Sequence, residues 1–512
     1  MPEFGKSIAE YSIGYGDIVT VSIVELSDGK LLYIVKEPLL DDVSKKFRER
    51  VYRFITNDVE IIKKISSFTS FDDGYDFVKD LVQKLCKKFL KKCSDNIISS
   101  IVYYVLRDLI GYGEVDPLIR DPNIEDVTCD GHDKPIYVFH NKYEWLETNK
   151  VLSREELERV IRRLTYRAGK EASVAQPIVE GILNPEGYRI HVVLDVVSMS
   201  GHSFTIRKFR ETPYTILELI NNGTLSPGVA ALLWIAAENK QGMIFYGPTG
   251  SGKTTLMNAV AMLLPPELKI VTAEDTHEIR LPFHDNWVSM VTRLSSDTYV
   301  QSVTLQAQVE SAMRQRPDIL ILGEIRSREA YSFFQAVSTG HGGLTTIHAE
   351  NVESLIRRLV APPMSVPKAL VASTRLFIQI QRFVLHKNVV RKVTYVHEVE
   401  DYNPSTDTII IKSVALWDRY NNVWKIDIKN SKTLDSIANL QVLRYEDIVK
   451  DLIMRATVLE YAAKLNLDIV SLHTLVRKYR RTPEDVYREA IDMLGSSYKI
   501  IELVDGDEKR YV

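Results

Sequence analysis

The sequence predicts an α/β protein whose C-terminal half is built on a parallel sheet, and two observations support this fold class. The first is the stretch G-P-T-G-S-G-K-T at 247–254, which has the pattern G-x-x-x-x-G-K-[ST] and lies between the strand-like run 243–246 and a helix-like run. The second is a set of three apolar runs that each end in an acidic residue or a histidine, at 269–275, 318–324 and 342–348. This spacing favours β-α-β units that feed one sheet.

The glycine-rich stretch has the chemistry of a phosphate-binding loop. Gly250 and Gly252 allow backbone N–H groups to turn toward phosphate oxygens, and the dipole of the following helix adds partial positive charge. Lys253 is long enough to reach the β- and γ-phosphates, and the Thr254 hydroxyl is a ligand for Mg²⁺. An ordinary glycine turn is the alternative, and the flanking strand and helix weigh against it. The predicted nucleotide-binding residues are Gly247, Pro248, Thr249, Gly250, Ser251, Gly252, Lys253, Thr254 and Thr255.

The residues that end the other apolar runs are candidate catalytic groups, because ligands of an open parallel sheet lie outside the carboxyl ends of its strands. In isolation, such a carboxylate is better explained as a helix cap, and such a histidine as a packed one. Beside a phosphate-binding loop, however, hydrolysis needs a carboxylate that orients water and groups that meet the developing charge. We expect Glu324 to position water, directly or through Mg²⁺, with Glu278 or Glu274 sharing that task. We expect His348 to contact the γ-phosphate and Gly323 to leave room near the nucleotide.

Composition is that of an ordinary globular protein. The chain has 512 residues, 45% of them hydrophobic and 26% charged, and its net charge of −3 gives no global basic field for nucleic acid. The cysteines, Cys86, Cys93 and Cys129, form no C-x-x-C pair, so neither a disulfide framework nor a structural zinc is expected. We expect a reduced, intracellular protein without a signal peptide or a membrane span.

The pattern along the chain divides it into two domains joined by a linker. Residues 1–220 are expected to form an N-terminal domain, with a helical bundle at about 41–110 and a mixed α/β part at about 111–218. The turn-rich segment 221–228 is the expected linker, and 229–512 the second domain with a helical C-terminal tail.

Local patterns in the N-terminal domain add detail. Ser153 with Glu156 predicts a capped helix over 155–168, and 188–197 with 203–209 alternates like a hairpin. The expected bundle also carries many basic residues, which are either its solvated face or a docking surface for a partner or for lipid headgroups. They are Lys45, Lys46, Arg48, Arg50, Lys63, Lys64, Lys84, Lys87, Lys88, Lys91 and Lys92.

Together these motifs resemble those of the secretion ATPase superfamily, which drives type II and type IV secretion, type IV pili and the archaellum. The segment 318–326 resembles its Walker B segment, 273–278 its acidic box and 339–349 its histidine box. In the N-terminal half, 111–118 and 124–127 resemble the N-terminal domain of that family. The resemblance covers roughly residues 105–400. Within the superfamily, the sequence most resembles the archaellum motor ATPase. This resemblance implies a RecA-like P-loop NTPase domain that is preceded along the chain by a mixed α/β N-terminal domain with a helical bundle.

The resemblance also implies roles for single residues. The loop from Gly247 to Thr254 would bind ATP and Mg²⁺, and Glu324, the Walker B glutamate, would hold the metal with Thr254. Glu274 and Glu278 would belong to the acidic box, and His341 and His348 to the histidine box. Many phosphate-loop enzymes have aspartate where Gly323 precedes Glu324, which leaves open which carboxylate holds Mg²⁺. Phosphate-contacting arginines are expected from the N-terminal domain, with another set as the alternative. The first set is Arg189, Arg207 and Arg210, and the alternative set is Arg280, Arg293 and Arg326.

The function implied by the resemblance is that of an ATP-hydrolysing motor. It would form a homo-hexamer and drive an archaellum or type IV pilus-like filament by pushing on a polytopic membrane platform protein. Other cytosolic motor components are further expected partners, nucleic acid is not, and the expected location is the cytoplasmic face of the cell membrane. The alternatives are a type IV pilus or type II secretion assembly ATPase, a RecA-like nucleic-acid translocase, and a nucleotide-gated scaffold without turnover.

Overall fold

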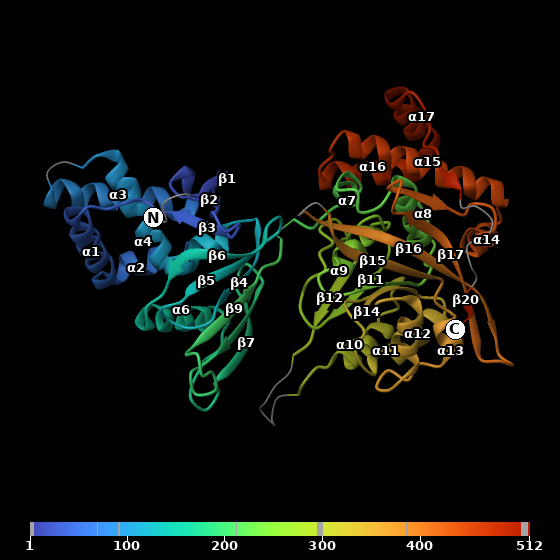
Figure 1. Ribbon diagram of the computed structural model, residues 1–512, viewed down its shortest axis with the longest axis horizontal. Helices are drawn as coiled ribbons and strands as arrows, with labels where there is room; N and C mark the ends of the chain where they lie inside the picture. The colour runs from blue at the N-terminus through green and yellow to red at the C-terminus, as the bar shows by residue number, and fades with distance from the viewer. Residues whose placement is uncertain are drawn as a thin grey trace. The chain divides into compact units, whose positions relative to one another are not determined.

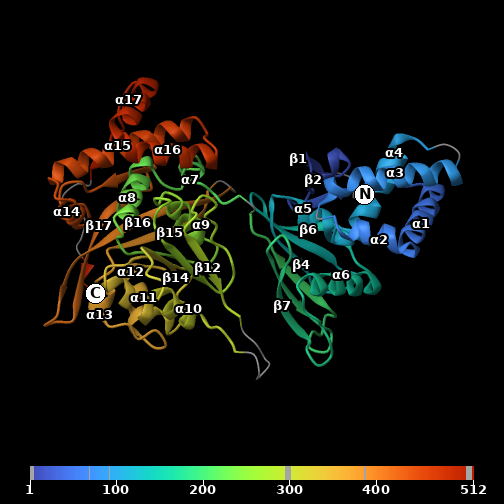
Figure 2. The same cartoon turned by 180° about the vertical axis from the view of Figure 1, so that it is seen from behind.

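The structure is a computed structural model that describes residues 5–68, 70–90, 93–210, 212–293, 301–385, 388–502 and 510–511. The chain forms two compact units, Met1–Glu211 and Thr212–Val512, called here the N-terminal and C-terminal units. Figure 1 and Figure 2 show both from opposite sides. No helix in the described part of the chain is both long and apolar enough to cross a membrane.

The N-terminal unit contains a helical bundle in the segment where one was expected. Its helices are α1 (Asp42–Asn57), α2 (Val59–Ser66), α3 (Phe71–Phe89) and α4 (Asp95–Leu109). A polar residue before each helix accepts a hydrogen bond from a backbone N–H of its first turn, which explains where each helix begins. These capping residues are Asp41, Asp58, Ser70 and Ser94.

The mixed α/β part of this unit is organised by a nine-stranded sheet in the order β1-β2-β3-β6-β5-β4-β9-β8-β7. Its strands are β1 (Lys6–Ser12), β2 (Thr20–Glu25), β3 (Leu31–Lys36), β4 (Ile124–Cys129), β5 (Pro135–His140), β6 (Glu144–Val151), β7 (Ile178–Leu183), β8 (Tyr188–Val193) and β9 (Ser203–Arg207). Short helical segments lie at η1 (Tyr15–Asp17), η2 (Gly113–Val115) and α5 (Asp116–Arg120). Ser153 and Glu156 form the predicted capping box of α6 (Arg154–Arg167), and β8 pairs antiparallel with β9 as the alternation predicted.

The cysteine prediction is wrong at one pair. Cys86 and Cys93 form a disulfide, whereas Cys129 is a buried free thiol. Cys86 lies in the last turn of α3, and Cys93 directly precedes the residue that caps α4. Their spacing matches no cysteine motif, so the pairing depends on how α3 packs against α4 and was not visible in the sequence.

The C-terminal unit is built on a sheet that is parallel at one end and antiparallel at the other, in the order β12-β11-β13-β14-β10-β15-β16-β17-β18-β19. The parallel strands are β12 (Trp287–Val291), β11 (Ile270–Glu274), β13 (Ile319–Leu322), β14 (Gly342–His348), β10 (Met243–Gly247) and β15 (Leu376–Leu385). The antiparallel extension consists of β16 (Asn388–Asn403), β17 (Thr408–Asp418) and β18 (Val423–Ile426), with the short strands β19 (Ile501–Glu502) and β20 (Arg510–Tyr511) at its margin. Every residue of β10, β11 and β13 is buried, as the continuous apolar runs predicted.

Helices cover both faces of this sheet. They are α7 (Ile216–Asn221), α8 (Pro227–Glu238), α9 (Lys253–Ala261), α10 (Leu305–Met313), α11 (Glu329–Ser338), α12 (Val352–Val360) and α13 (Lys368–Val371). The C-terminal tail is helical, as expected, with α14 (Lys432–Gln441), α15 (Tyr445–Lys464), α16 (Ile469–Arg481) and α17 (Pro483–Leu494). The unit therefore has the RecA-like α/β architecture that the sequence predicted.

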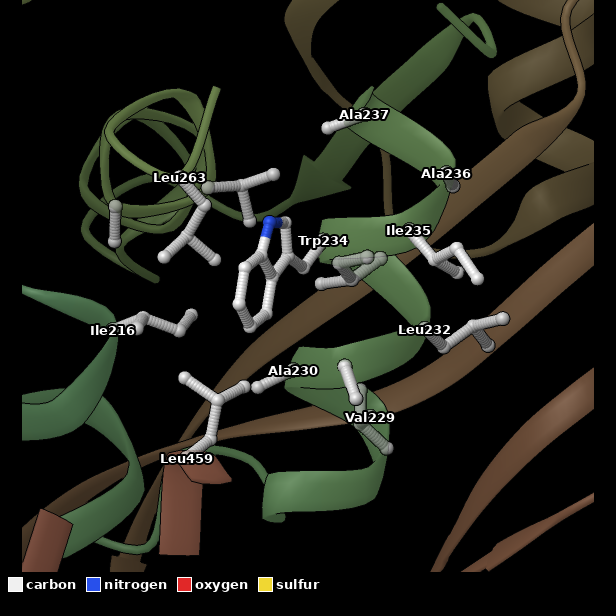
Figure 3. Packing of buried hydrophobic residues seen from close by; sticks show 14 of the residues in the cluster. Ile216, Val229, Ala230, Leu232, Trp234, Ile235, Ala236, Ala237, Leu263 and Leu459 are labelled. Carbon is white, nitrogen blue, oxygen red and sulfur yellow. The ribbon is translucent and has the colours of Figure 1, made fainter. Parts of the chain in front are cut away.

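The core of the C-terminal unit includes residues that precede the expected linker. Figure 3 shows Trp234 of α8 packed among three side chains: Ile216 of α7, Leu263 just after α9, and Leu459 of α15. Because α7 buries its apolar side chains in this core, the chain divides at 211/212 and the turn-rich segment 221–228 lies inside the C-terminal unit.

Candidate functional site

The phosphate-binding loop joins β10 to α9 at the carboxyl edge of the parallel strands. Two of its glycines are required by the backbone. A side chain at Gly247 would overlap the carbonyl oxygen of Ile380 in β15, and Gly252 has φ +92° directly before α9 begins. Thr254 and Thr255 follow in the first turn of α9 and are partly exposed. The loop, the start of α9 and this hydroxyl pair lie next to one another, an arrangement that suits a phosphate group.

Lys253 is buried and is held by groups from two directions. Its Nζ donates a hydrogen bond to Pro248 O at 2.9 Å and lies 3.1 Å from His348 Nδ1. The Thr249 hydroxyl lies 3.5 Å from the same imidazole nitrogen. The lysine is therefore held by the loop and the histidine.

The parallel register explains why His348 and Glu324 lie at this loop. β10 pairs with β14 so that Gly247 stands opposite His348, and β14 also pairs with β13, which ends just before Glu324. His348 Nε2 is 3.2 Å from Glu324 Oε1. Burial and the nearby charge of Lys253 lower the pKa of His348, which favours a neutral imidazole between the lysine and the carboxylate.

Arg326 extends this chain of contacts on the far side of Glu324. Its guanidinium donates to Glu324 Oε2 at 2.7 Å and lies 3.8 Å from Asp275 Oδ2. Glu324 Oε1 is buried, and the His348 imidazole lies beside it at 3.2 Å. The Glu324 carboxylate is therefore flanked by an imidazole on one oxygen and a guanidinium on the other, and its role as the Walker B glutamate stays a prediction.

Glu274 has an environment unlike that of Glu324. It is 1% exposed, and its Oε1 accepts hydrogen bonds from the backbone N–H groups of Glu278 and Ile279 at 3.0 and 2.9 Å. Burial raises its pKa to about 8, so the carboxyl is largely protonated at neutral pH. The geometry favours a role in shaping the acidic loop. Glu278 is partly exposed and is the better candidate of the two for contact with metal or water.

The expectation that Gly323 leaves room near the nucleotide stays a prediction, and the structure gives the glycine a close neighbour within the protein. A Cβ at Gly323 would lie 3.3 Å from Glu274 Cγ, so the side chain of Glu274 occupies that space. The glycine is required because two neighbouring strand ends approach each other closely there.

The histidine box and the alternative arginines are spread over the unit. His341 precedes β14 and His348 ends it, which separates them by roughly 23 Å at about 3.3 Å per residue. Arg280 donates its backbone N–H to Asn258 Oδ1 in α9, and Arg293 donates to Gln301 O. Of the three alternative arginines, Arg326 is the one that donates a hydrogen bond to Glu324.

The arginines expected from the N-terminal half lie in the N-terminal unit. Arg189 of β8 and Arg207 of β9 are directly opposite each other in the ladder, and both are exposed. Arg189 lies 3.6 Å from Glu180 Oε2, and Arg210, also exposed, follows β9. Like charges placed opposite each other in a sheet are unfavourable, which is consistent with an anion-binding role.

Sequence reasoning missed one residue that touches the loop. Arg391 of β16 donates a hydrogen bond from Nε to Gly250 O at 3.1 Å. It stands opposite Arg382 in the β15–β16 ladder, on the strand pair adjacent to β10. No motif marks it, because it lies about 140 residues beyond the loop within an ordinary strand pattern. A donor on this carbonyl helps to keep the loop N–H groups directed toward phosphate.

This fold and site define a P-loop nucleotide-binding protein. Residues 146–415, more than half of the chain, match the family model described as "Type II/IV secretion system protein", and the chain belongs to that family. The predicted resemblance to the secretion ATPase superfamily is thereby confirmed.

Individual relatives and a solved structure are similar to parts of this chain. Uncharacterized protein MJ0900 of Methanocaldococcus jannaschii is 33% identical over 469 residues, which are 87% of this chain and 84% of that protein. A putative conjugal transfer protein of Mycobacterium tuberculosis is 31% identical over 268 residues, 50% of this chain and 73% of that protein. The solved structure of the VirB11 ATPase of the Brucella suis type IV secretion system matches 57% of this chain and 94% of its own, at 25% identity and a TM-score of 0.29.

We predict that Glu274→Gln flattens the dependence of stability on pH. Between pH 4.5 and about 8 the folded protein keeps a proton on Glu274 that the unfolded chain has lost, so stability falls as pH rises through this window. The slope approaches about 1.4 kcal/mol per pH unit for one group. Thermal unfolding of the full chain at pH 5 to 8 measures it. Glu278→Gln is the control, and equal slopes in wild type and the Glu274 variant would contradict the assignment.

We predict that Arg391→Ala weakens binding of ATP and ADP alike by roughly tenfold, about 1.4 kcal/mol, since the loop loses a donor on Gly250 O. Titration with a fluorescent nucleotide analogue measures both affinities. Arg382→Ala, on the adjacent strand, is the matched control. Wild-type affinity in the Arg391 variant would show that the contact does not support the loop.

Proposed function

We propose that the protein hydrolyses ATP and works as a hexameric motor for an archaellum-like or type IV pilus-like filament. The observation that supports hydrolysis is the meeting of Lys253, His348 and Glu324 at adjacent strand ends beside the phosphate-binding loop. Membership in the type II/IV secretion system family supports a role in secretion or filament assembly.

The residues of the site suggest how turnover proceeds. Lys253 exchanges its bonds to Pro248 O and His348 for oxygens of the β- and γ-phosphates. Thr254 and Glu324 are the groups that would hold Mg²⁺, which supplies positive charge at the phosphate oxygens. Glu324 orients the attacking water, and Arg326 holds the other oxygen of that carboxylate.

His348 links the lysine to the carboxylate in this proposal. A neutral imidazole can accept a hydrogen bond from Lys253 and donate one to Glu324. When Lys253 turns to the phosphates, His348 loses one partner and is free to contact the γ-phosphate. Departure of that phosphate restores the original contacts, so the histidine registers the state of the nucleotide.

We further propose that Arg189 and Arg207 contact phosphate oxygens of the nucleotide, with Arg210 as a third candidate. Their interaction with ATP would favour a closed arrangement of the two units over an open one, and loss of the γ-phosphate would remove that preference. In a hexamer, this cycle would move a polytopic membrane platform protein at the cytoplasmic face of the membrane, together with other cytosolic motor components.

A type IV secretion motor is the second candidate, because relatives of this chain are described as conjugal transfer proteins. Co-purification of the full chain with its membrane partner would separate the two: a filament platform protein supports the first proposal, and a secretion-channel protein the second. Stimulation of phosphate release by added DNA or RNA would instead favour a nucleic-acid translocase.

We predict that Lys253→Ala lowers ATP affinity at least tenfold, about 1.4 kcal/mol, because the phosphates lose a buried positive charge. Glu324→Gln should keep ATP affinity and lower turnover by roughly a hundredfold or more, because the carboxylate that orients water is gone. Phosphate release and nucleotide titration on the full chain measure both.

The control for this pair is Lys240→Ala, since Lys240 pairs with Asp318 at 2.6 Å at the opposite edge of the sheet. Wild-type turnover in Glu324→Gln would remove the proposed role of that residue. Absence of phosphate release by the wild-type chain, alone and with its membrane partner, would overturn the motor proposal.

We predict that Arg189→Ala and Arg207→Ala each slow ATP hydrolysis by about tenfold or more while leaving ADP affinity nearly unchanged, since their contacts depend on the γ-phosphate. Arg162→Ala, an exposed arginine of α6 in the same unit, is the control. Normal hydrolysis rates in both variants would mean that arginines of the C-terminal unit, and not Arg189 and Arg207, contact the phosphate oxygens.

A further inference from the structure

The N-terminal unit contains a cavity of about 660 Å³ that the proposed ATPase function does not use. It lies between α1, α4 and α6, next to η2 and the end of β6, and its volume is in the range of small-molecule binding sites. The lining residues carry both signs of charge, so the chemistry of a ligand depends on which of them are already paired.

The inner carboxylates of this cavity are committed to protein groups. Glu37 accepts hydrogen bonds from Lys150 and, at 2.8 Å, from Arg107. Asp108 accepts from Arg107 Nε at 2.7 Å. Glu156 is occupied by the capping box of α6. None of these three carboxylates is left to neutralise a cation in the cavity.

Two arginines on the α1 wall lack such partners. Arg48 and Arg53 line the cavity and have no carboxylate within 4.0 Å in the described part of the chain. The Arg48 guanidinium lies over the Tyr104 ring, 5.1 Å from its centre. Glu49 of the same helix also lines the cavity, so the uncommitted groups of this wall are two arginines and one glutamate, and positive charge is in excess by one.

The α6 wall and a tyrosine add further hydrogen-bond donors. Arg159 has one long contact, 3.5 Å, to Glu114, whereas Arg163 is already bonded to the carbonyl oxygens of Asp108 and Gly111. The Tyr52 hydroxyl, in a half-buried side chain, has no hydrogen-bond partner among the described residues. Guanidinium groups on two facing walls with a hydroxyl donor suit a multiply charged phosphate-bearing group.

We propose that this cavity binds a phosphate-bearing small molecule of up to nucleotide size, at a second site separate from the phosphate-binding loop. Arg48, Arg53 and Arg159 bind its phosphate oxygens, and Tyr52 donates a hydrogen bond. Such a ligand would connect α1 of the helical bundle to α6 of the mixed α/β part and would stabilise the N-terminal unit by mass action.

The test uses the full chain with Lys253→Ala, so that the loop no longer binds phosphate tightly, and inorganic pyrophosphate as the probe. Isothermal titration should show one site per chain, and the melting temperature should rise with pyrophosphate. Arg53→Glu on this background should weaken binding at least tenfold, and Arg48→Ala should do the same. AMP and ATP as further probes tell whether a base adds affinity.

The matched control is Arg50→Ala, since Arg50 lies on the same helix, over the ring of Phe89, and does not line the cavity. It should leave binding unchanged. Because Arg53 is exposed and unpaired, its substitution leaves the fold intact, which circular dichroism verifies. Absence of pyrophosphate binding at millimolar concentration, or equal loss in Arg50→Ala and Arg53→Glu, would overturn the proposal. Neither result bears on ATP hydrolysis by the wild-type chain.

Discussion

The parallel pairing of β10 with β14 is the constraint on which the candidate site depends. That register places Gly247 beside His348, and the next pairing, of β14 with β13, brings Glu324 to the same edge. The strands are buried on both faces, so a shift of register would disrupt close packing against the helices on each side and is disfavoured. The sheet thus determines the distance between the phosphate-binding lysine and the carboxylate to within the precision of a hydrogen-bond ladder.

The charges at this edge are arranged so that none is buried without compensation. Lys253 is held by a carbonyl and an imidazole, and Glu324 by Arg326. Glu274, the most buried carboxyl of the group, favours its neutral form because burial disfavours the charge. Two acidic residues that look equivalent in a sequence pattern therefore have different protonation states, and the difference follows from burial.

Much of both units was predictable because the patterns that predict them are local. The glycine loop, the apolar strands, the Ser153 cap and the β8–β9 pair each depend on residues close in sequence. The disulfide, the contact of Arg391 and the closeness of Glu274 to Gly323 depend on which distant segments become neighbours. A single sequence does not contain that information, and for the same reason the domain boundary was expected after α7 and not before it.

The packing around Trp234 has a consequence for how the protein can be divided. The family match ends at residue 415, yet Trp234 and Ile216 bury themselves against Leu459 of α15, and Arg455 of that helix lies 4.5 Å above the indole ring. A fragment that ended at residue 415 would lack α15, and the apolar side chains around Trp234 would be exposed to water. The C-terminal folding unit is thus larger than the segment that the family model covers, and the tail helices are structural members of the nucleotide-binding body.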